Sequence, residues 1–343
     1  MRYVFLTPHT KVSGGTKVII RFAEYVNRIS KDNRVAIVAK KLNPTYWMCT
    51  PKLKEITCNL VVEKDARKKH LKNADVIVDY LDGDPEEVKD LKKDNAKHIL
   101  LLQGYGTQNE EKENRNLSYP YDAVIATSSW LARLALKANH EKVFVIPPAV
   151  DEIFRPLPKL FSCQIPVGGL LHSSEDKNSD VLLAALSMAA SQGAKRERKY
   201  KAMLVAARVE YAKKELFQNM HCQYAIFIDP PTSFLPLIYN QCKVWVATSK
   251  NEGFGLPPLE AMACGVPVVW TKNKGLEDYL VSGKNCLVSD GTKKDLMAKI
   301  GRLINERSLR EQITKNGMIL AQSFKWSKQG ARFVNTVKKI TGE

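Results

Sequence analysis

The stretch from residue 244 to residue 270 reads Val244-Trp-Val-Ala-Thr-Ser-Lys-Asn-Glu-Gly-Phe-Gly-Leu-Pro-Pro-Leu-Glu-Ala-Met-Ala-Cys-Gly-Val-Pro-Val-Val-Trp270. It begins with an apolar segment and turns through Gly253 and Gly255. Two prolines follow, and they suit a helix entry because the first amide protons of a helix have no partner within it. Gly265 stands where a glycine ends a helix, and a second apolar segment begins after it. The stretch therefore predicts a strand, a loop, a short helix and another strand.

Two glutamates lie eight positions apart in this stretch. Glu252 falls in the predicted loop, and Glu260 falls in what we expect to be the first turn of the helix. Glycines before a helix let a ligand approach the backbone, and the amides at the helix start favour phosphate oxygens. Carboxylates on either side can accept hydrogen bonds from hydroxyl groups. Taken alone, the pair also has a plainer interpretation, in which Glu260 complements the helix dipole and Glu252 is solvated.

Short apolar segments alternate with helical patterns along the rest of the chain. The spacing of Val18, Phe22, Val26 and Ile29 predicts an amphipathic helix between the first two segments. Buried strands that alternate with helices indicate parallel sheets in a doubly wound α/β fold. The predicted strands are residues 3–6, 35–39, 76–78, 99–102, 123–126 and 143–146, and then 201–206, 225–228, 244–248, 266–270 and 286–288.

The organisation of the chain follows from these two series of strands. A total of 343 residues suits two domains of roughly 100–200 residues each. The proline-containing segment 154–159 between the series is a candidate linker. Helices are predicted over residues 295–304 and 309–321, and a last helix from residue 326 has one apolar face. Two Rossmann-like domains with a cleft between them are the simplest architecture, and ligands bind such sheets at the carboxyl ends of their strands.

The span from Glu252 to Val269 closely resembles the signature of the family 4 retaining glycosyltransferases, E-G-F-G-L-P-x-x-E-A-M-A-x-G-x-P-V-V. Weaker likenesses to that family follow in order along the chain, at residues 13–17, 127–131, 145–151 and 324–326. The resemblance implies the GT-B fold. Residues 1–153 would then form an acceptor-binding domain, residues 160–325 a nucleotide-sugar-binding domain, and residues 326–343 a helix that crosses back to the first domain.

The resemblance also implies an activity. Members of this group are retaining, metal-independent hexosyltransferase-type enzymes. They move a sugar from a nucleotide-sugar donor to a glycan, lipid-linked or glycolipid acceptor in the synthesis of cell-surface polysaccharides and glycoconjugates. No cofactor is expected, because the nucleotide-sugar is a substrate. Asp82-Gly-Asp84 has the spacing of a metal-binding D-x-D motif, but the GT-B fold does not require one, so we interpret it as a loop.

The roles of individual residues are carried over from the family motif. Glu252 resembles the glutamate that contacts the donor sugar near the reaction centre, and Glu260 the one that binds the ribose hydroxyls. Lys177 resembles the lysine that neutralises the diphosphate. The loop residues Gly253, Phe254, Gly255 and Leu256 would line the sugar and phosphate. Gly14 and Gly15 resemble the glycine pair that follows the first strand and brings the backbone near the donor phosphate or the acceptor.

Three positions depart from the family pattern. His172 stands where the family has an arginine, and a neutral imidazole cannot replace a bidentate guanidinium. Either His172 donates one hydrogen bond or Arg208 approaches from the next loop, unless His172 is a plain surface residue. The segment 204–208 replaces the usual G-x-G. Gln103 stands where many members have a histidine, and it can hydrogen-bond a sugar hydroxyl without acting as a base, or it is a turn residue.

Composition limits the partners and the compartment. The formal charge of +17 favours anionic partners such as phosphorylated substrates, an anionic membrane surface or nucleic acid. The basic segment 64–70 is a candidate membrane patch or a solvated helix face. Seven scattered cysteines without a C-x-x-C pair indicate buried thiols in a reducing compartment. We expect no signal peptide or membrane span, and hence a cytoplasmic protein with contact at the inner membrane face as a further possibility.

Two other classes of function compete with the transferase. A non-catalytic GT-B subunit that binds a partner transferase would explain the changes at His172 and Gln103, although the intact pair of glutamates argues against it. A nucleic-acid-binding module would explain the charge, but the sequence holds no recognisable nucleic-acid motif. We therefore expect no nucleic-acid partner.

Overall fold

The computed structural model describes residues 1–7, 14–39, 59–61, 64–81, 83–106, 110–159, 165–172, 175–194, 200–212, 217–218, 220 and 222–343. The chain forms two compact units. The first comprises Met1–Ala149 and Trp326–Glu343, and the second comprises Val150–Lys325. We expected residues 150–153 in the first domain, but they lie in the second unit.

The first unit is built on a seven-stranded parallel sheet with the order β3-β2-β1-β4-β5-β6-β7. Its central strands are buried over nearly their whole length, as their apolar sequences predict. All six strands expected in this half are present, and β3 is an addition. The strands are β1 (Arg2–Thr7), β2 (Arg34–Ala39), β3 (Asn59–Val61), β4 (Val76–Tyr80), β5 (Lys97–Leu102), β6 (Ala123–Ala126) and β7 (Val143–Val145).

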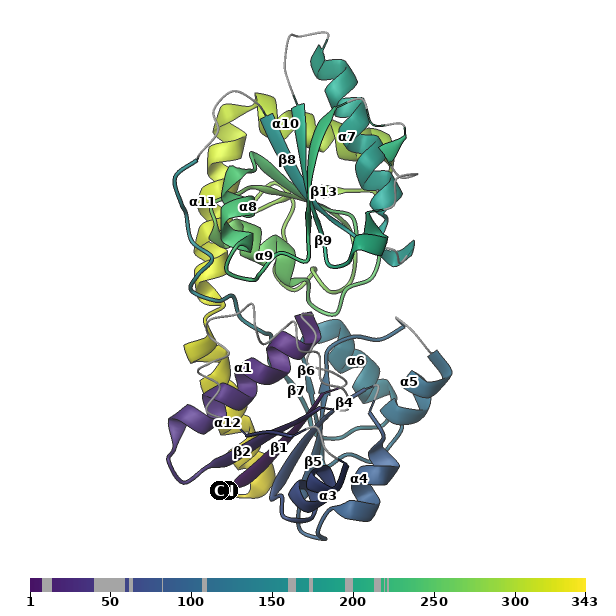
Figure 1. The fold of residues 1–343 in the computed structure, drawn as a ribbon, viewed down its shortest axis with the longest axis vertical. Helices are drawn as coiled ribbons and strands as arrows, with labels where there is room; N and C mark the ends of the chain where they lie inside the picture. Colours follow the sequence, from purple (N-terminus) through teal and green to yellow (C-terminus); the bar gives the residue numbers. More distant parts are fainter. Residues whose placement is uncertain are drawn as a thin grey trace. The chain divides into compact units, whose positions relative to one another are not determined.

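Helices lie on both sides of this sheet (Figure 1). Helices α1 (Gly14–Ile29) and α12 (Trp326–Thr341) lie together on one side. The Phe22 and Phe333 rings stack with centroids 4.6 Å apart, and a Cβ at Gly330 would lie 2.3 Å from the Tyr25 ring. The last helix thus packs its predicted apolar face onto the start of the chain. The other helices are α3 (Lys64–Lys72), α4 (Pro85–Leu91), α5 (Glu110–Leu117) and α6 (Ser129–Lys137).

The second unit contains a six-stranded parallel sheet with the order β10-β9-β8-β11-β12-β13. Helices α8, α9 and α11 lie on one side of it, and α7 and α10 pack against each other on the other side (Figure 1). The strands are β8 (Ile165–Leu171), β9 (Tyr200–Ala206), β10 (Gln223–Ile228), β11 (Val244–Ala247), β12 (Val268–Thr271) and β13 (Leu287–Ser289). The helices are α7 (Ser179–Ala194), α8 (Leu235–Gln241), α9 (Leu256–Ala263), α10 (Lys293–Asn305) and α11 (Arg307–Ser323), with 3₁₀ turns η2 (Glu175–Lys177) and η3 (Val209–Tyr211).

Strand β8 lies in the middle of this sheet and was not predicted from the sequence. Its two glycines argue against a strand, because glycine weakens strands. The structure gives the reason for them. A Cβ at Gly168 would lie 2.3 Å from the Trp245 ring and 2.5 Å from Cys242 Sγ, and a Cβ at Gly169 would lie 2.6 Å from Leu182 Cδ2. Glycine is required here by close packing, which no local pattern reveals.

We predict that Gly168→Ala lowers the free energy of unfolding by about 1–3 kcal/mol, the usual cost of forcing an extra group into a packed core. The matched control is Gly301→Ala in helix α10, where the nearest atom to a new Cβ is 4.0 Å away. There alanine should be neutral or stabilise by up to about 1 kcal/mol. Denaturant unfolding of both variants measures the difference, and equal stabilities would show that the packing around Trp245 tolerates a methyl group.

Helix α9 confirms most of the prediction made for it. Gly255 precedes it with φ of 80° and ψ of 72°, a left-handed conformation that suits glycine. At the other end, Gly265 N donates to Met262 O and Val266 N to Ala261 O, both at 3.0 Å, which is the Schellman pattern of helix ends. One expectation was wrong. The helix begins at Leu256, so Glu260 lies in its second turn, because the left-handed glycine and not the first proline sets the boundary.

Candidate functional site

Four of the residues singled out by the sequence follow strands of the second unit's sheet. His172 follows β8 directly and Lys177 ends η2 just beyond it; Arg208 follows β9, and Glu252 lies in the loop after β11. Because all pairings in this sheet are parallel, the carboxyl ends of its strands share one edge. We call these four residues the edge cluster.

Lys177 and Glu252 form an ion pair within the edge cluster. Lys177 Nζ donates to Glu252 Oε1 at 2.6 Å, and both side chains are only partly exposed, at 24% and 20%. Two further hydrogen bonds join their loops: Thr248 Oγ1 donates to Lys177 O at 2.8 Å, and Lys250 N donates to Asp176 O at 2.6 Å. A cation and a carboxylate are thus held side by side in a fixed position, where one can meet a phosphate and the other a hydroxyl.

His172 lies near this ion pair, and its own side chain is uncharged at neutral pH. Its ring packs on Tyr211 of η3 with centroids 4.3 Å apart. Partial burial, together with the positive charges of Lys177 and Arg208, lowers the pKa of His172 below its ordinary value, and Glu252 opposes this only in part. The imidazole is therefore neutral at pH 7, where it can donate or accept one hydrogen bond.

Arg208 is the candidate for the guanidinium that the sequence lacks at position 172. Its guanidinium carbon lies 5.8 Å from the centre of the Tyr211 ring, and its charge acts on His172. A cation at this distance over an aromatic ring is attracted to it. Tyr211 thus contacts both residues, and nothing in the sequence singled it out, because its role depends on the placement of η3 beside β8.

Glu260 is buried in helix α9, at 5% exposure. Tyr239 Oη of helix α8 donates a hydrogen bond to its Oε2 at 3.1 Å. A buried carboxylate in the second turn does not complement a helix start, and Glu252 is ion-paired, so the plainer interpretation of the two glutamates is wrong on both counts. The partner Tyr239 comes from a different helix, and sequence reasoning missed it.

Tyr279 fixes the loop from Gly253 to Leu256 by hydrogen bonding to its backbone. The Tyr279 hydroxyl lies 3.0 Å from Phe254 O and 2.6 Å from Gly255 O, so it can donate to either carbonyl. The Phe254 ring is buried against the rings of Tyr279 and Phe324. The side chain of Phe254 therefore belongs to the core, and only its backbone is available to a ligand at this loop.

A second support holds the backbone of Glu252. Asn273, which follows β12, donates from Nδ2 to Ser249 O at 2.9 Å, and its Oδ1 accepts from Gly275 N at 3.1 Å. A Cβ at Gly275 would lie 2.1 Å from Glu252 O. Only glycine allows this close approach. The Asn-Lys-Gly turn is visible in the sequence, but its contact with Glu252 is not.

We predict that Gly275→Ala lowers turnover about tenfold while leaving the protein folded, because the new methyl group must displace the Glu252 backbone and misplacement of a reacting group is costly. Gly301→Ala serves again as the control, since it adds the same methyl group far from Glu252. Steady-state kinetics of the two variants provide the test. If Gly275→Ala retains full turnover, the position of Glu252 is not critical.

The first unit holds the remaining predicted residues. Gln103 follows β5, and Gly14 and Gly15 are the first two residues of α1. A Cβ at Gly15 would lie 3.7 Å from Gln103 Oε1, whereas one at Gly14 would have no neighbour within 4 Å. The structure thus brings Gly15 and Gln103 together and leaves the Gly14 position open. The preceding residue Ser13 lies outside the described residues.

Three further expectations from the sequence concern the Asp82-Gly-Asp84 segment, the basic segment 64–70 and metal binding. Asp84 caps helix α4, its Oδ1 accepting from Glu87 N at 3.3 Å, while Asp82 lies outside the described residues. Residues 64–70 form most of helix α3, whose Lys69 and His70 line a cavity of about 390 Å³. In the described part of the chain, no group of three or more His, Cys, Asp or Glu side chains is arranged to hold a metal ion.

Four of the seven cysteines lie in the described part of the chain. Cys242, Cys264 and Cys286 are buried as expected, and burial raises the pKa of each thiol to about 12. Cys222 is only half-buried, contrary to expectation, and the other three cysteines lie outside the described residues. None of the helices in the described ranges combines the length and apolar character needed to traverse a bilayer.

Comparison with known proteins shows that most of the second unit is similar to one family. Residues 173–318 match the family model described as glycosyl transferases group 1. An uncharacterized glycosyltransferase of Methanocaldococcus jannaschii is 37% identical over 89 residues, which are 26% of this chain and 25% of the relative. The O-antigen chain mannosyltransferase B of Escherichia coli is 38% identical over 111 residues, 32% of this chain and 29% of the relative. The matched segments thus span between a quarter and a third of these two relatives.

Solved structures resemble the chain over nearly its full length. Anabaena Alr3699/HepE in complex with UDP-glucose superposes with a TM-score of 0.78 at 20% identity, covering 99% of this chain and 100% of that one. A glycosyltransferase from Rickettsia africae gives a TM-score of 0.80 at 17% identity, covering 99% and 98%. At such identities the likeness concerns the fold. The segment 173–318 is therefore similar to the glycosyl transferases group 1 family, and the chain that carries it has the two-domain α/β GT-B fold.

Proposed function

We propose that this protein is a retaining glycosyltransferase that moves a sugar from a nucleotide-sugar donor to a glycan, lipid-linked or glycolipid acceptor in the synthesis of cell-surface polysaccharide or glycoconjugate. The observation that carries the proposal is the ion pair between Lys177 and Glu252 at the carboxyl edge of the second sheet. The relation to an O-antigen mannosyltransferase supports the acceptor class, and the UDP-glucose complex of Alr3699/HepE supports the donor class.

In the proposed reaction, the second unit binds the donor. Lys177 and the amides at the start of helix α9 stabilise the diphosphate, which gains negative charge as the bond to the anomeric carbon breaks. Glu252 accepts hydrogen bonds from the sugar, and Glu260 accepts them from the ribose. Arg208 supplies the charge that the neutral His172 lacks, and His172 contributes a single hydrogen bond.

From the first unit, Gln103 hydrogen-bonds a sugar hydroxyl, and Gly14 and Gly15 bring the backbone near the donor phosphate or the acceptor. The acceptor oxygen forms the new bond to the anomeric carbon on the face from which the diphosphate leaves, and a phosphate oxygen takes up the proton. Positioning and charge stabilisation suffice for this step, so we assign the enzyme neither a metal nor a cofactor. The buried thiols suit a cytoplasmic site of action.

The configuration of the product tests the proposal. Purified protein is incubated with a nucleotide-sugar and an acceptor, and proton NMR follows the anomeric signal of the first product. We expect the anomeric configuration of the donor to be kept. An inverted product would contradict the retaining mechanism while leaving transferase activity intact.

A non-catalytic partner subunit is the second candidate, favoured by the neutral His172 in place of an arginine. The two candidates differ in nucleotide release. Free nucleoside diphosphate produced by the purified protein supports the enzyme, whereas donor binding without release over long incubation supports the subunit.

A further inference from the structure

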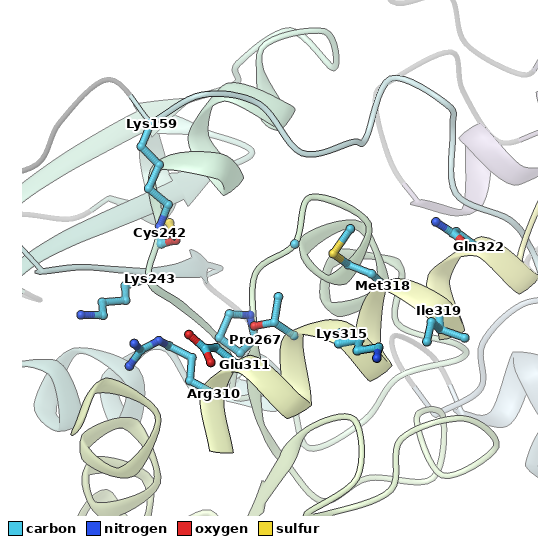
Figure 2. A pocket seen from close by; sticks show the side chains of 12 residues that line it. Lys159, Cys242, Lys243, Pro267, Arg310, Glu311, Lys315, Met318, Ile319 and Gln322 are labelled. Atoms are coloured by element: carbon cyan, nitrogen blue, oxygen red, sulfur yellow. Dashed lines mark hydrogen bonds between the residues drawn. The ribbon is translucent and has the colours of Figure 1, made fainter. Parts of the chain in front are cut away.

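Figure 2 shows a cavity of about 610 Å³ in the second unit. It lies on the edge of the sheet opposite the edge cluster, as the positions of its lining residues in the chain show. Lys243, which lines it, immediately precedes β11, and Pro267 immediately precedes β12. The cavity is therefore at the amino ends of these strands, whereas Glu252 follows the carboxyl end of β11. Helix α11 forms one wall. The proposed transfer reaction uses none of these residues.

One end of the cavity is strongly cationic. Lys159, Lys243 and Arg310 gather there, and Lys315 lies further along helix α11 (Figure 2). Among the residues that line the cavity, Glu311 supplies the one carboxylate. The Glu311 carboxylate accepts from Arg307 Nε at 2.7 Å, outside the cavity, so four cations of the lining face a single acidic group.

Two of these cations, Lys159 and Arg310, are held by backbone carbonyls and repel each other. Arg310 Nη1 donates to the carbonyl oxygens of Leu303 and Ile304, each at 2.9 Å, which fixes the guanidinium at the end of helix α10. Lys159 Nζ donates to Cys242 O at 3.3 Å. Partial desolvation of the ammonium group lowers the pKa of Lys159; Cys242 opposes this, and the smaller effect of the Arg310 charge also lowers the pKa. A bound anion would relieve this repulsion.

The other end of the cavity is apolar. Met318 and Ile319 lie there on helix α11, away from the cationic end (Figure 2). Ile319 is 58% exposed, so its side chain is accessible to a ligand. The cavity volume falls in the range of roughly 300–1,000 Å³ typical of sites for small organic molecules. A bare inorganic anion would leave most of it empty.

We propose that this cavity binds an organophosphate, with the phosphate against Lys159, Lys243 and Arg310 and an apolar carbon skeleton along Met318 and Ile319. A phosphate group suits a cavity end lined by three cations because it carries up to two charges and three acceptor oxygens. The ligand is separate from the nucleotide-sugar. A soluble phosphate ester and the headgroup of a membrane phospholipid share this chemistry.

The test uses the full chain and two probes that separate these sources. Isothermal titration with soluble dihexanoyl phosphatidic acid measures binding of a free ester. Flotation with vesicles of equimolar phosphatidylglycerol and phosphatidylcholine measures binding to a membrane. The variant Lys159→Gln/Lys243→Gln removes two of the charges placed against the phosphate, Ile319→Ser removes the exposed apolar group, and Lys294→Gln removes an exposed charge on helix α10 as the matched control.

We expect wild-type protein to bind at least one probe, and the double variant to bind it about thirtyfold more weakly, at about 1 kcal/mol for each charge lost. Ile319→Ser should also weaken binding, and Lys294→Gln should not. Binding of dihexanoyl phosphatidic acid alone identifies a soluble ester, and vesicle binding identifies a membrane headgroup. The proposal is overturned if neither probe binds, or if Lys294→Gln weakens binding as much as the double variant.

Two further measurements keep the result independent of the transferase proposal. The single variant Lys243→Gln should weaken binding several-fold by itself, so a folding defect in the double variant cannot hide the effect. Nucleotide-sugar binding is measured on the same samples and should be unchanged, because the cavity and the edge cluster lie on opposite edges of the sheet. Loss of organophosphate binding with intact nucleotide binding therefore separates the two proposals.

Discussion

Lys177→Ala is expected to lower kcat by about two to three orders of magnitude, the usual loss when one group that stabilises developing charge is removed. Lys177 is the cation of the edge cluster whose ammonium group is already fixed, 2.6 Å from Glu252. Charge on the diphosphate grows as the glycosidic bond breaks, so the loss should fall on kcat more than on KM. Steady-state kinetics with a saturating acceptor measure the split.

Two controls accompany this experiment. Lys294→Ala removes an exposed lysine of helix α10 and should leave both constants unchanged. Glu252→Ala should lower kcat as well, and the double variant should lose less than the product of the two single losses, because paired residues act as a unit. Full activity in Glu252→Ala would contradict the role given to that residue.

The second large effect concerns Glu260. Glu260→Gln should weaken nucleotide binding about tenfold to a hundredfold, since a hydrogen bond to a charged group contributes about 1.5–3 kcal/mol. Glutamine keeps an acceptor for the Tyr239 hydroxyl, which now lies 3.1 Å from Glu260 Oε2. The variant therefore tests the charge without leaving a buried donor unpaired. Isothermal titration with a nucleoside diphosphate gives the affinity.

Tyr239→Phe is the matched variant for this prediction. It removes the buried hydroxyl and keeps the carboxylate, so it should lower stability by about 1 kcal/mol with only a small change in nucleotide affinity. If Tyr239→Phe weakens nucleotide binding as strongly as Glu260→Gln does, then Glu260 serves to anchor two helices and does not bind ribose.

The parts of the fold that the sequence predicted are those with local causes. Helix α9 has prolines and a left-handed glycine at its start and Gly265 at its end, and each acts on neighbouring backbone. The strands β1, β2, β4, β5 and β6 are largely apolar segments that are buried over nearly their whole length. Strand β8 was missed because Gly168 and Gly169 meet Trp245 and Leu182 only after folding.

The candidate site likewise contains residues that the sequence reveals and residues that only the structure reveals. Glu252, Glu260 and Lys177 carry chemistry in their own side chains and stand in a recognisable motif. Gly275 supports the site through its close approach to the Glu252 backbone, and Tyr279 supports it through a hydroxyl that donates to the loop. Both contacts join residues more than twenty positions apart, so only the structure reveals them. The cationic cavity was even harder to predict from the sequence, because its charged residues are scattered between positions 159 and 315.

The central claim is that the edge cluster and Glu260 bind a nucleotide-sugar donor. The most direct test is the thermal shift of purified wild-type protein with UDP-, GDP-, dTDP- and ADP-sugars, repeated with Glu260→Gln. We predict that at least one donor raises Tm and that Glu260→Gln reduces this rise at the same donor concentration. If no donor of the panel shifts Tm, or if the shift is the same in Glu260→Gln, the donor site does not lie where we place it.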